Sequence, residues 1–275
     1  NEGLMVGRVD LTDYNDRMVN DGAWLVRETN DFGDGWDRLR NDGFIQTAFD
    51  GGEAEQTYFD NLERFRNRGI LSMQDEDAGN DVDVDRDYTY ISGAFIGGGY
   101  LGIDAFLGGV DSTADVLEID GSVSRTTRVN VNDVNSGPGA YNAEGITFAV
   151  VNGGGAELDN FIMDEDSANA VRGGRNVIDK GMFFYDIALV SPSSEMSIFA
   201  LELPGDEFRL IGVPDHEAME MPTLATAAQG LWHDTAGVWL DRQVDLRNQI
   251  LMAGTMEQGA DLPVAADPAR KPGGA

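Results

Sequence analysis

Short stretches of alternating or continuous apolar residues fill the middle of the chain, residues 88–213, and Gly, Asn, Asp and Pro separate them. Runs of this length that are rich in Val, Ile, Phe and Tyr are typical of β-strands. The pattern predicts strands in the segments YTYISGAFI, DVLEID, SVSRTTRVNV, GITFAVV, MFFYDIALV, SIFALEL and EFRLIGV. This part of the chain is therefore expected to form a β-rich core.

Residues 1–87 follow a different pattern, which is polar and rich in turn-forming residues. The segment EAEQTYFDNLERFRNRG has the best helical spacing there, because Tyr58, Leu62 and Phe65 lie on one side and Gly69 supplies a stop. A looser helical patch is TDYNDRMVNDGAWLV. We expect an irregular N-terminal arm that contains one or two helices.

A long helical pattern covers residues 223–252, although Gly230 and Gly237 weaken it. The Trp232/Trp239 pair, seven residues apart, fits an anchor in the core or a contact between subunits. The apolar face of this helix is made of Trp232, Ala236, Trp239, Leu246 and Ile250.

Together these patterns predict an α+β protein with a β-rich centre, an irregular N-terminal arm, a long C-terminal helix and an extended tail. The size and the mixed content fit an HK97-like shell fold. No internal repeat of 20–50 residues is visible. The expected parts are an N-terminal arm and helical region at 1–87, a β-rich core domain at 88–215, a C-terminal helical segment at 216–254 and an extended tail at 255–275.

The charge of the chain is strongly unbalanced, with 49 acidic residues against 19 basic ones and a net charge of −30. Only Lys180 and Lys271 are lysines, and 41% of the residues are hydrophobic. Such a charge opposes compaction unless salt screens it, and at molar salt the Debye length is about 3 Å. We infer a halophilic source, an archaeon or one of its viruses.

The same charge argues against a direct nucleic-acid site, because phosphate backbones need basic patches. The dense basic cluster of the chain is Arg64, Arg66 and Arg68 in ERFRNRG. We interpret it as a solvated helix face with internal acidic partners. A contact with packaged DNA or with an acidic neighbouring subunit is the alternative.

Catalytic residue types are scarce. The chain has no cysteine, which excludes disulfides, thiolate metal sites and cysteine nucleophiles, and its two histidines are His216 and His233. Each histidine lies beside a carboxylate in the sequence, so each is a candidate general base, but a lone histidine is more often structural. No apolar run reaches the roughly 18–20 residues of a spanning helix, so no membrane span is expected.

The segment IGGGYLG contains the spacing G-x-G-x-x-G, formed by Gly97, Gly99 and Gly102, behind an apolar run. This spacing occurs where a turn binds a nucleotide, provided that a helix follows and that an acidic residue comes about 20 residues later to hold the ribose. Glu118 or Asp120 has the position of that acid.

Two interpretations of IGGGYLG stay open. The first is a Rossmann-like nucleotide- or S-adenosylmethionine-dependent enzyme, in which Asp186 also lines the site. The second is a glycine-rich turn between β-strands whose backbones approach closely. Gly108 and Gly109 interrupt the helix that the first interpretation requires, which favours the second.

An acidic run, DEDAGNDVDVDRD, precedes the first predicted strand. The alternating carboxylates Asp81, Asp83, Asp85 and Asp87 would lie on one face of an extended segment and could bind Mg²⁺, Ca²⁺, Na⁺ or K⁺ through oxygen. Arg86 stands where an EF-hand loop needs glycine, so the run is not such a loop. A solvated acidic loop is the alternative.

These observations favour a structural subunit of a large symmetric assembly over an enzyme, with a capsid-type protein of a haloarchaeal virus as the leading case. Tail-tube and surface-layer subunits fit nearly as well. The expected partners are copies of the chain and other virion proteins, and no cofactor is required. The expected location is the virion or the cell exterior, or the cytoplasm for the enzyme. The first residue, Asn1, fits either a proteolytically matured chain or a numbering that starts inside a longer sequence.

Overall fold

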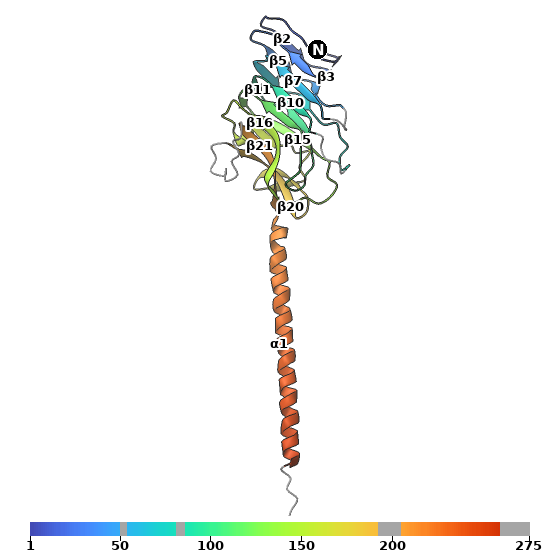
Figure 1. The fold of residues 1–275 in the computed structure, drawn as a ribbon, viewed down its shortest axis with the longest axis vertical. Helices are drawn as coiled ribbons and strands as arrows, with labels where there is room; N and C mark the ends of the chain where they lie inside the picture. Colours follow the sequence, from blue (N-terminus) through green and yellow to red (C-terminus); the bar gives the residue numbers. More distant parts are fainter. Residues whose placement is uncertain (50–53, 81–85, 192–204, 259–275) are drawn as a thin grey trace, which may run out of the picture. The chain divides into compact units, whose positions relative to one another are not determined.

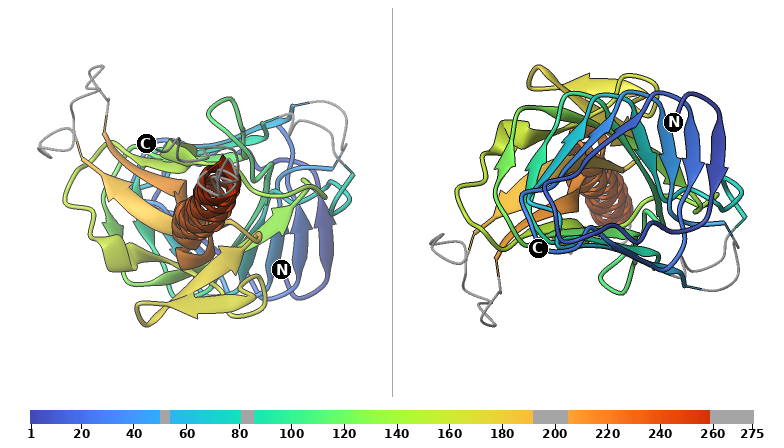
Figure 2. Two further views of the ribbon diagram at one scale, coloured as in Figure 1. Left: turned by 90° about the horizontal axis from the view of Figure 1, so that it is seen from below. Right: turned by 90° about the horizontal axis from the view of Figure 1, so that it is seen from above.

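The structure is a computed structural model that describes residues 1–49, 54–80, 86–191 and 205–258. The chain falls into two compact units, residues 1–219 and 220–275. The first unit consists of short β-strands that wind into stacked coils, a β-solenoid (Figure 1). In Figure 2 its strands follow one another in chain order, from the N-terminal strands in blue to the last strand in orange.

Each full coil contributes one strand to each of three sheets, and strands of successive coils pair in parallel. Sheet A consists of β1 (Leu4–Val6), β3 (Ala23–Leu25), β6 (Phe44–Gln46), β9 (Ile70–Ser72), β12 (Tyr100–Ala105), β15 (Thr127–Asp133) and β17 (Phe161–Met163). Sheet C consists of β2 (Arg17–Asn20), β5 (Arg38–Asn41), β8 (Arg64–Asn67), β11 (Ala94–Ile96) and β14 (Val123–Ser124).

Sheet B begins with parallel strands and ends with antiparallel ones. Its parallel strands are β4 (Thr29–Asp31), β7 (Gln56–Asp60), β10 (Tyr88–Ile91), β13 (Val116–Ile119) and β16 (Asn142–Val151). Its antiparallel strands are β18 (Ala170–Arg172), β19 (Arg175–Asp179), β20 (Phe183–Val190) and β21 (Asp206–Pro214), and a short 3₁₀ turn, η1 (Leu158–Asn160), precedes β17.

The core of the solenoid is built from rows of inward-facing side chains, because residues in register on parallel strands stack directly on one another. In sheet A one inward row is almost fully buried and wholly apolar. Aromatic rings continue the core between sheets, for example Phe59 on β7 of sheet B against Phe65 on β8 of sheet C at 5.4 Å between ring centroids. The sheet A row is Trp24, Ile45, Leu71, Leu101, Val129 and Met163.

A ladder of asparagines occupies the corner between sheets C and A. The side-chain amide of Asn1 donates to Asn20 Oδ1, that of Asn20 to Asn41 Oδ1 and that of Asn41 to Asn67 Oδ1, each at 2.8 Å. Asn67 Nδ2 then donates to the carbonyl of Tyr100 at 2.9 Å. The ladder satisfies polar groups that the corner buries, which would otherwise be costly.

Glycines follow the asparagines at the same corner. A Cβ added to any of these glycines would overlap the carbonyl oxygen of the glycine one coil earlier. Gly22 would meet Gly3 in this way, and Gly43, Gly69 and Gly99 would meet Gly22, Gly43 and Gly69. Neighbouring backbones approach here more closely than any side chain allows. The corner therefore requires glycine in the coils from Gly22 to Gly99, whereas Thr127 holds the equivalent position in the next coil.

The α+β prediction and the HK97-like shell fold are wrong, because residues 1–219 form a β-solenoid. The predicted helix in EAEQTYFDNLERFRNRG is also wrong, because β7 and β8 occupy it and Asn61 turns the chain between them with φ 54°. TDYNDRMVNDGAWLV likewise contains strands β2 and β3. These strands have only three to five residues, too few for a period of two to stand out.

The sequence does contain a repeat, contrary to the prediction. DRMVNDG, DRLRNDG and ERFRNRG, at residues 16–22, 37–43 and 63–69, each form a strand of sheet C and the Asn-x-Gly corner after it. The connecting segments differ in length from coil to coil, so the repeat has no fixed period. Sheets A and B run unbroken across residue 88 through β9–β12 and β7–β10.

Strand predictions from residue 88 onward are confirmed by β10, β11, β13, β14, β15, β16, β20 and β21. The segment SIFALEL lies outside the described residues.

The predicted C-terminal helix is confirmed as α1 (His216–Gln258). Its apolar face does not form a core within the described residues, since Trp232, Trp239, Leu246 and Ile250 are 53–71% exposed. The predicted tail lies outside the described residues from residue 259 onward.

Candidate functional site

The outward face of sheet A carries a row of apolar side chains. Phe44, Ile70 and Tyr100 stack in register on β6, β9 and β12, and each directly follows a corner glycine. Ile70 is 41% exposed and Tyr100 is 37% exposed. Arg128, next in the row, lies over the Tyr100 ring at 5.7 Å from its centroid. Phe44, Ile70 and Tyr100, but not Arg128, form one wall of a hollow of about 310 Å³.

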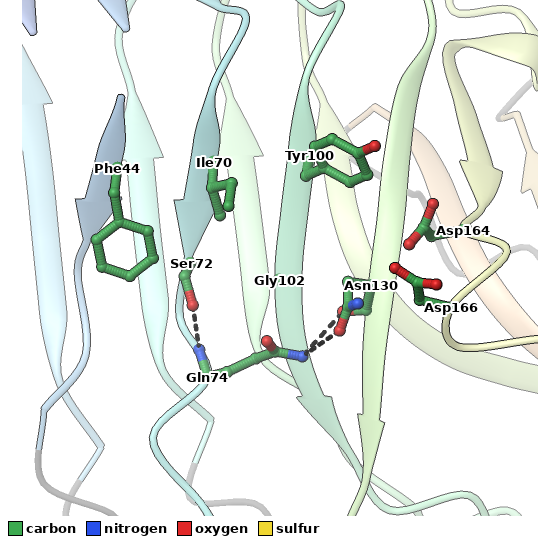
Figure 3. A pocket seen from close by; sticks show the side chains of 9 residues that line it. All are labelled: Phe44, Ile70, Ser72, Gln74, Tyr100, Gly102, Asn130, Asp164 and Asp166. Atoms are coloured by element: carbon green, nitrogen blue, oxygen red, sulfur yellow. Dashed lines mark hydrogen bonds between the residues drawn. The ribbon is translucent and has the colours of Figure 1, made fainter. Parts of the chain in front are cut away.

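A polar floor lies beside the apolar row (Figure 3). The side-chain amide of Gln74 donates to the backbone carbonyl and to Oδ1 of Asn130, at 3.1 and 3.0 Å, and Gln74 N–H donates to Ser72 Oγ at 3.2 Å. A Cβ on Gly102 would lie 2.9 Å from Gln74 Oε1. Because Gly102 has no side chain, the Gln74 side chain has space to lie across the strands.

Two carboxylates, Asp164 and Asp166, close the hollow at one edge (Figure 3). Asp164 is buried and follows β17, and its N–H donates to the carbonyl of Val129 at 2.9 Å. Asp166 is exposed. An apolar wall, an amide floor and an acidic edge are a combination that recognises ligands with both apolar faces and hydroxyl groups.

The sequence patterns missed this hollow. The available signal was the residue after each corner glycine, because Gly43–Phe44, Gly69–Ile70 and Gly99–Tyr100 repeat a glycine followed by a bulky side chain. Its three members are 26 and 30 residues apart, so only the alignment of the coils brings them into one row.

The glycine motif belongs to the fold. Gly97, Gly98 and Gly99 form the corner between β11 and β12, and the residues after them are a strand, not the helix that a nucleotide-binding turn requires. A Cβ on Gly97 would overlap Thr127 Oγ1, and one on Gly99 would overlap the carbonyl oxygen of Gly69. The parallel pairing of β10 with β7 and β13 is that of stacked coils.

The acids proposed beside that motif lie in different places. Glu118 accepts hydrogen bonds from Tyr88 Oη at 2.7 Å and from Asn152 Nδ2 at 2.9 Å, and Asp120 is exposed after β13. Asp186 pairs with Arg175 at 3.2 Å, and burial raises its pKa. The structure does not bring these acids into the hollow on sheet A.

Of the predicted cation ligands, Asp81, Asp83 and Asp85 lie outside the described residues. Asp87 is buried at the start of β10, where its Oδ1 accepts the N–H of Glu55 at 2.7 Å. Across the described ranges, no group of three or more His, Asp or Glu side chains is placed to hold a metal ion.

A buried carboxyl, Asp115, lies next to Asp87 and Asp104 inside the solenoid. Its two oxygens accept the N–H groups of Asp87 at 3.2 Å and of Asp104 at 2.7 Å. Burial, reinforced by the two neighbouring carboxylates, raises the pKa of Asp115 to about 9. A pKa raised this far favours the protonated form of the carboxyl at neutral pH.

The two histidines do not share a site in the described chain. His216 Nδ1 lies 2.9 Å from Asp215 Oδ1, and hydrogen bonds from Arg172 first and from His216 hold the pKa of Asp215 well below its usual range. His233 lies on α1 with its ring against Trp232, 5.3 Å between centroids.

A scan against protein-family models finds no match, and a search of curated proteins finds no relative. Among the described residues, no helix combines the length and the apolarity needed to cross a membrane.

Proposed function

We propose that this protein is a structural subunit of a homo-oligomeric assembly from a halophilic source, as in the virion of a haloarchaeal virus, and that copies associate through α1. The observation that carries the proposal is the exposed apolar face of α1. The net charge of −30 supports the location, because a surface rich in carboxylates suits contact with concentrated salt.

Some of the apolar residues of α1 follow a heptad spacing, while Leu231, Val238, Leu240 and Val244 lie outside it. Trp232, Trp239 and Leu246 recur every seven residues, with Ala236 and Ile250 at the complementary positions. A seven-residue repeat keeps one seam of a helix against a partner helix over several turns. The partner of such a seam is another helix of the same pitch.

A second copy of α1 is the occupant that the sequence favours. Gln229 and Gln243 occupy the same seam as the tryptophans, and identical polar residues pair with each other when identical helices align in register. The helix also contains Gly230 and Gly237, which lower its intrinsic stability. Packing against a copy would supply the stability that an isolated helix of this composition lacks.

The test is the mass of the full chain in molar KCl, measured by light scattering after size exclusion. We expect a multiple of the 29.7 kDa monomer. Trp239→Ala should lower the mass, and Val244→Ala, at 56% exposure against 60% for Trp239, should not. A monomeric wild type, or equal effects of the two changes, would contradict the proposal.

The hollow on sheet A favours a second role, saccharide binding. Sugar rings have apolar faces that pack on aromatic and aliphatic side chains, and hydroxyl groups that bond to amides and carboxylates. Tyr100 and Ile70 supply the first kind of contact, and Asn130, Asp164 and Asp166 the second.

Calorimetric titration of the full chain with a panel of neutral hexasaccharides tests this role. Tyr100→Ala should weaken the binding of an accepted hexasaccharide about tenfold by removing the ring that it packs on. Tyr14→Ala, which removes a ring 76% exposed outside the hollow, is the control. Binding by no member of the panel, or equal losses in both variants, would exclude the role.

A further inference from the structure

Sheet C carries a ladder of arginines on its outward face. Arg17, Arg38 and Arg64 are in register on β2, β5 and β8, and Arg40 and Arg66 form a second row two residues further along β5 and β8. Adjacent strands are about 4.8 Å apart, so five guanidinium groups are carried by three neighbouring rungs. This arrangement concentrates positive charge in a chain with a net charge of −30.

Most of this ladder is not neutralised from within. Arg40 pairs with Asp42 at 2.6 Å and Asp21 at 3.6 Å. By contrast, Arg17, Arg38, Arg64 and Arg66 form no ion pair with any carboxylate of the described chain.

Arg66 illustrates the cost of this arrangement. Its Nε is buried and has no hydrogen-bond partner in the part of the chain that the structure describes. Desolvation first, and then the charges of Arg68 and Arg125, lower its pKa. Like charges opposite one another destabilise a sheet, so the ladder imposes a cost on the folded chain.

The acids closest in sequence serve the backbone instead. Asp16, Asp37 and Glu63 each precede a ladder arginine in the chain. Asp37 Oδ1 accepts the N–H of Asp16, and Glu63 Oε2 accepts the N–H of Asp37. The carboxylates of Asp37 and Glu63 therefore link neighbouring coils through backbone N–H groups.

The ladder lines a hollow of about 200 Å³. At its edge the indole of Trp36 lies under Arg38 and Arg64, with guanidinium carbons 3.9 and 5.0 Å from the ring centroid. Stacking on an indole orients a guanidinium group without using its hydrogen-bond donors. The donors therefore stay available at the hollow.

We propose that this hollow binds tetrahedral oxyanions, sulfate or phosphate, either as free ions or as esters carried by a polymer. A tetrahedral oxyanion has four acceptor oxygens, which can accept hydrogen bonds from guanidinium groups on three rungs. A planar carboxylate has only two oxygens and cannot contact as many of them. The double negative charge offsets the repulsion between the arginines. The site is separate from the hollow on sheet A.

Calorimetric titration of the full chain with sodium sulfate, at constant ionic strength in KCl, is the test. Arg38→Gln/Arg64→Gln should weaken sulfate binding at least about tenfold. Arg128→Gln removes an exposed arginine from sheet A and should leave the binding unchanged. No binding by the wild type, or equal binding by all three proteins, would overturn the proposal.

The double variant should unfold no more easily than the wild type without sulfate, because it loses a like-charge contact. If it does not fold, Arg17→Gln, at the exposed end of the ladder, gives the same comparison.

Sulfated dextran that binds more tightly than sulfate at equal sulfate concentration would assign a polymer-borne ester, and equal affinities would assign the free ion. A lower oligomer mass with unchanged sulfate binding would place the carboxylates of a second copy there and overturn the proposal.

Discussion

The solenoid and α1 both arrange apolar side chains in regular rows, but they bury them very differently. Trp24 in the solenoid is fully buried, whereas Trp232 and Trp239 on α1 are 68% and 60% exposed. In the solenoid each coil covers the next, so the rows are closed by the chain itself. On α1 the row stays exposed within the described residues, and under the proposed association a second copy would cover it. Regular apolar spacing therefore marks a surface that can pack. The topology of the chain determines whether the same chain buries that surface or leaves it exposed.

The largest effect is expected at the corner where the coils meet. Gly69→Ala would put a Cβ on the carbonyl oxygen of Gly43, which is backbone and cannot move aside. We expect the free energy of unfolding to fall by about 3 kcal/mol, the upper end for overpacking. Urea unfolding at constant KCl, followed by tryptophan fluorescence, measures it.

Gly3→Ala is the matched control at the open end of the same stack, because an added Cβ there meets nothing within 4 Å. Its effect should stay within about 0.5 kcal/mol. Similar losses in both variants would show that glycine matters here for reasons other than the approach of the coils.

A smaller effect concerns pH and the buried carboxyl of Asp115, whose pKa is raised to about 9. Between about pH 4 and 9 the folded chain keeps this proton and the unfolded chain has lost it, so stability falls as the pH rises. The slope from this one group is at most about 1.4 kcal/mol per pH unit.

Asp115→Asn removes that slope but offers one acceptor to the two N–H groups of Asp87 and Asp104. At pH 5 the variant should be less stable than the wild type by about 1–3 kcal/mol. Because the wild type then loses up to about 1.4 kcal/mol per pH unit and the variant does not, the order of stability should reverse before pH 9. Parallel stability curves across this range would show that the carboxyl is ionised in the folded chain. Asp120→Asn, at an exposed position, serves as the control.

The same contrast explains what the sequence could predict. Strands such as β16, with 10 residues, and β20, with eight, are long enough for their apolar pattern to be read. The N-terminal coils have strands of three to five residues, and side chains from both faces, such as the outward Tyr58 and the inward Phe65, fell by chance at helical spacing. The DRLRNDG repeat held the missing information, because its Asn and Gly mark the corner and its arginines mark the outward face.

The two hollows could not be predicted in the same way. Phe44, Ile70 and Tyr100 become neighbours only because parallel coils stack in register, and the connections between them have different lengths. The glycines of IGGGYLG were visible in the sequence, but a corner and a nucleotide-binding turn both need glycine for close backbone approach. Only the strand that follows distinguishes the two.

The smallest expected effect is a gain in stability, and it concerns α1. Gly230 has open space around its Cα, so Gly230→Ala should add about 1 kcal/mol to the stability of the helix through propensity alone. Thermal melting followed by far-ultraviolet circular dichroism measures it. The proposed seam through Trp232 and Trp239 leaves Gly230 outside the contact, so the mass of the oligomer should not change. A variant that melts lower and loses mass would instead place glycine at the contact between helices, with alanine acting there as it does at Gly69.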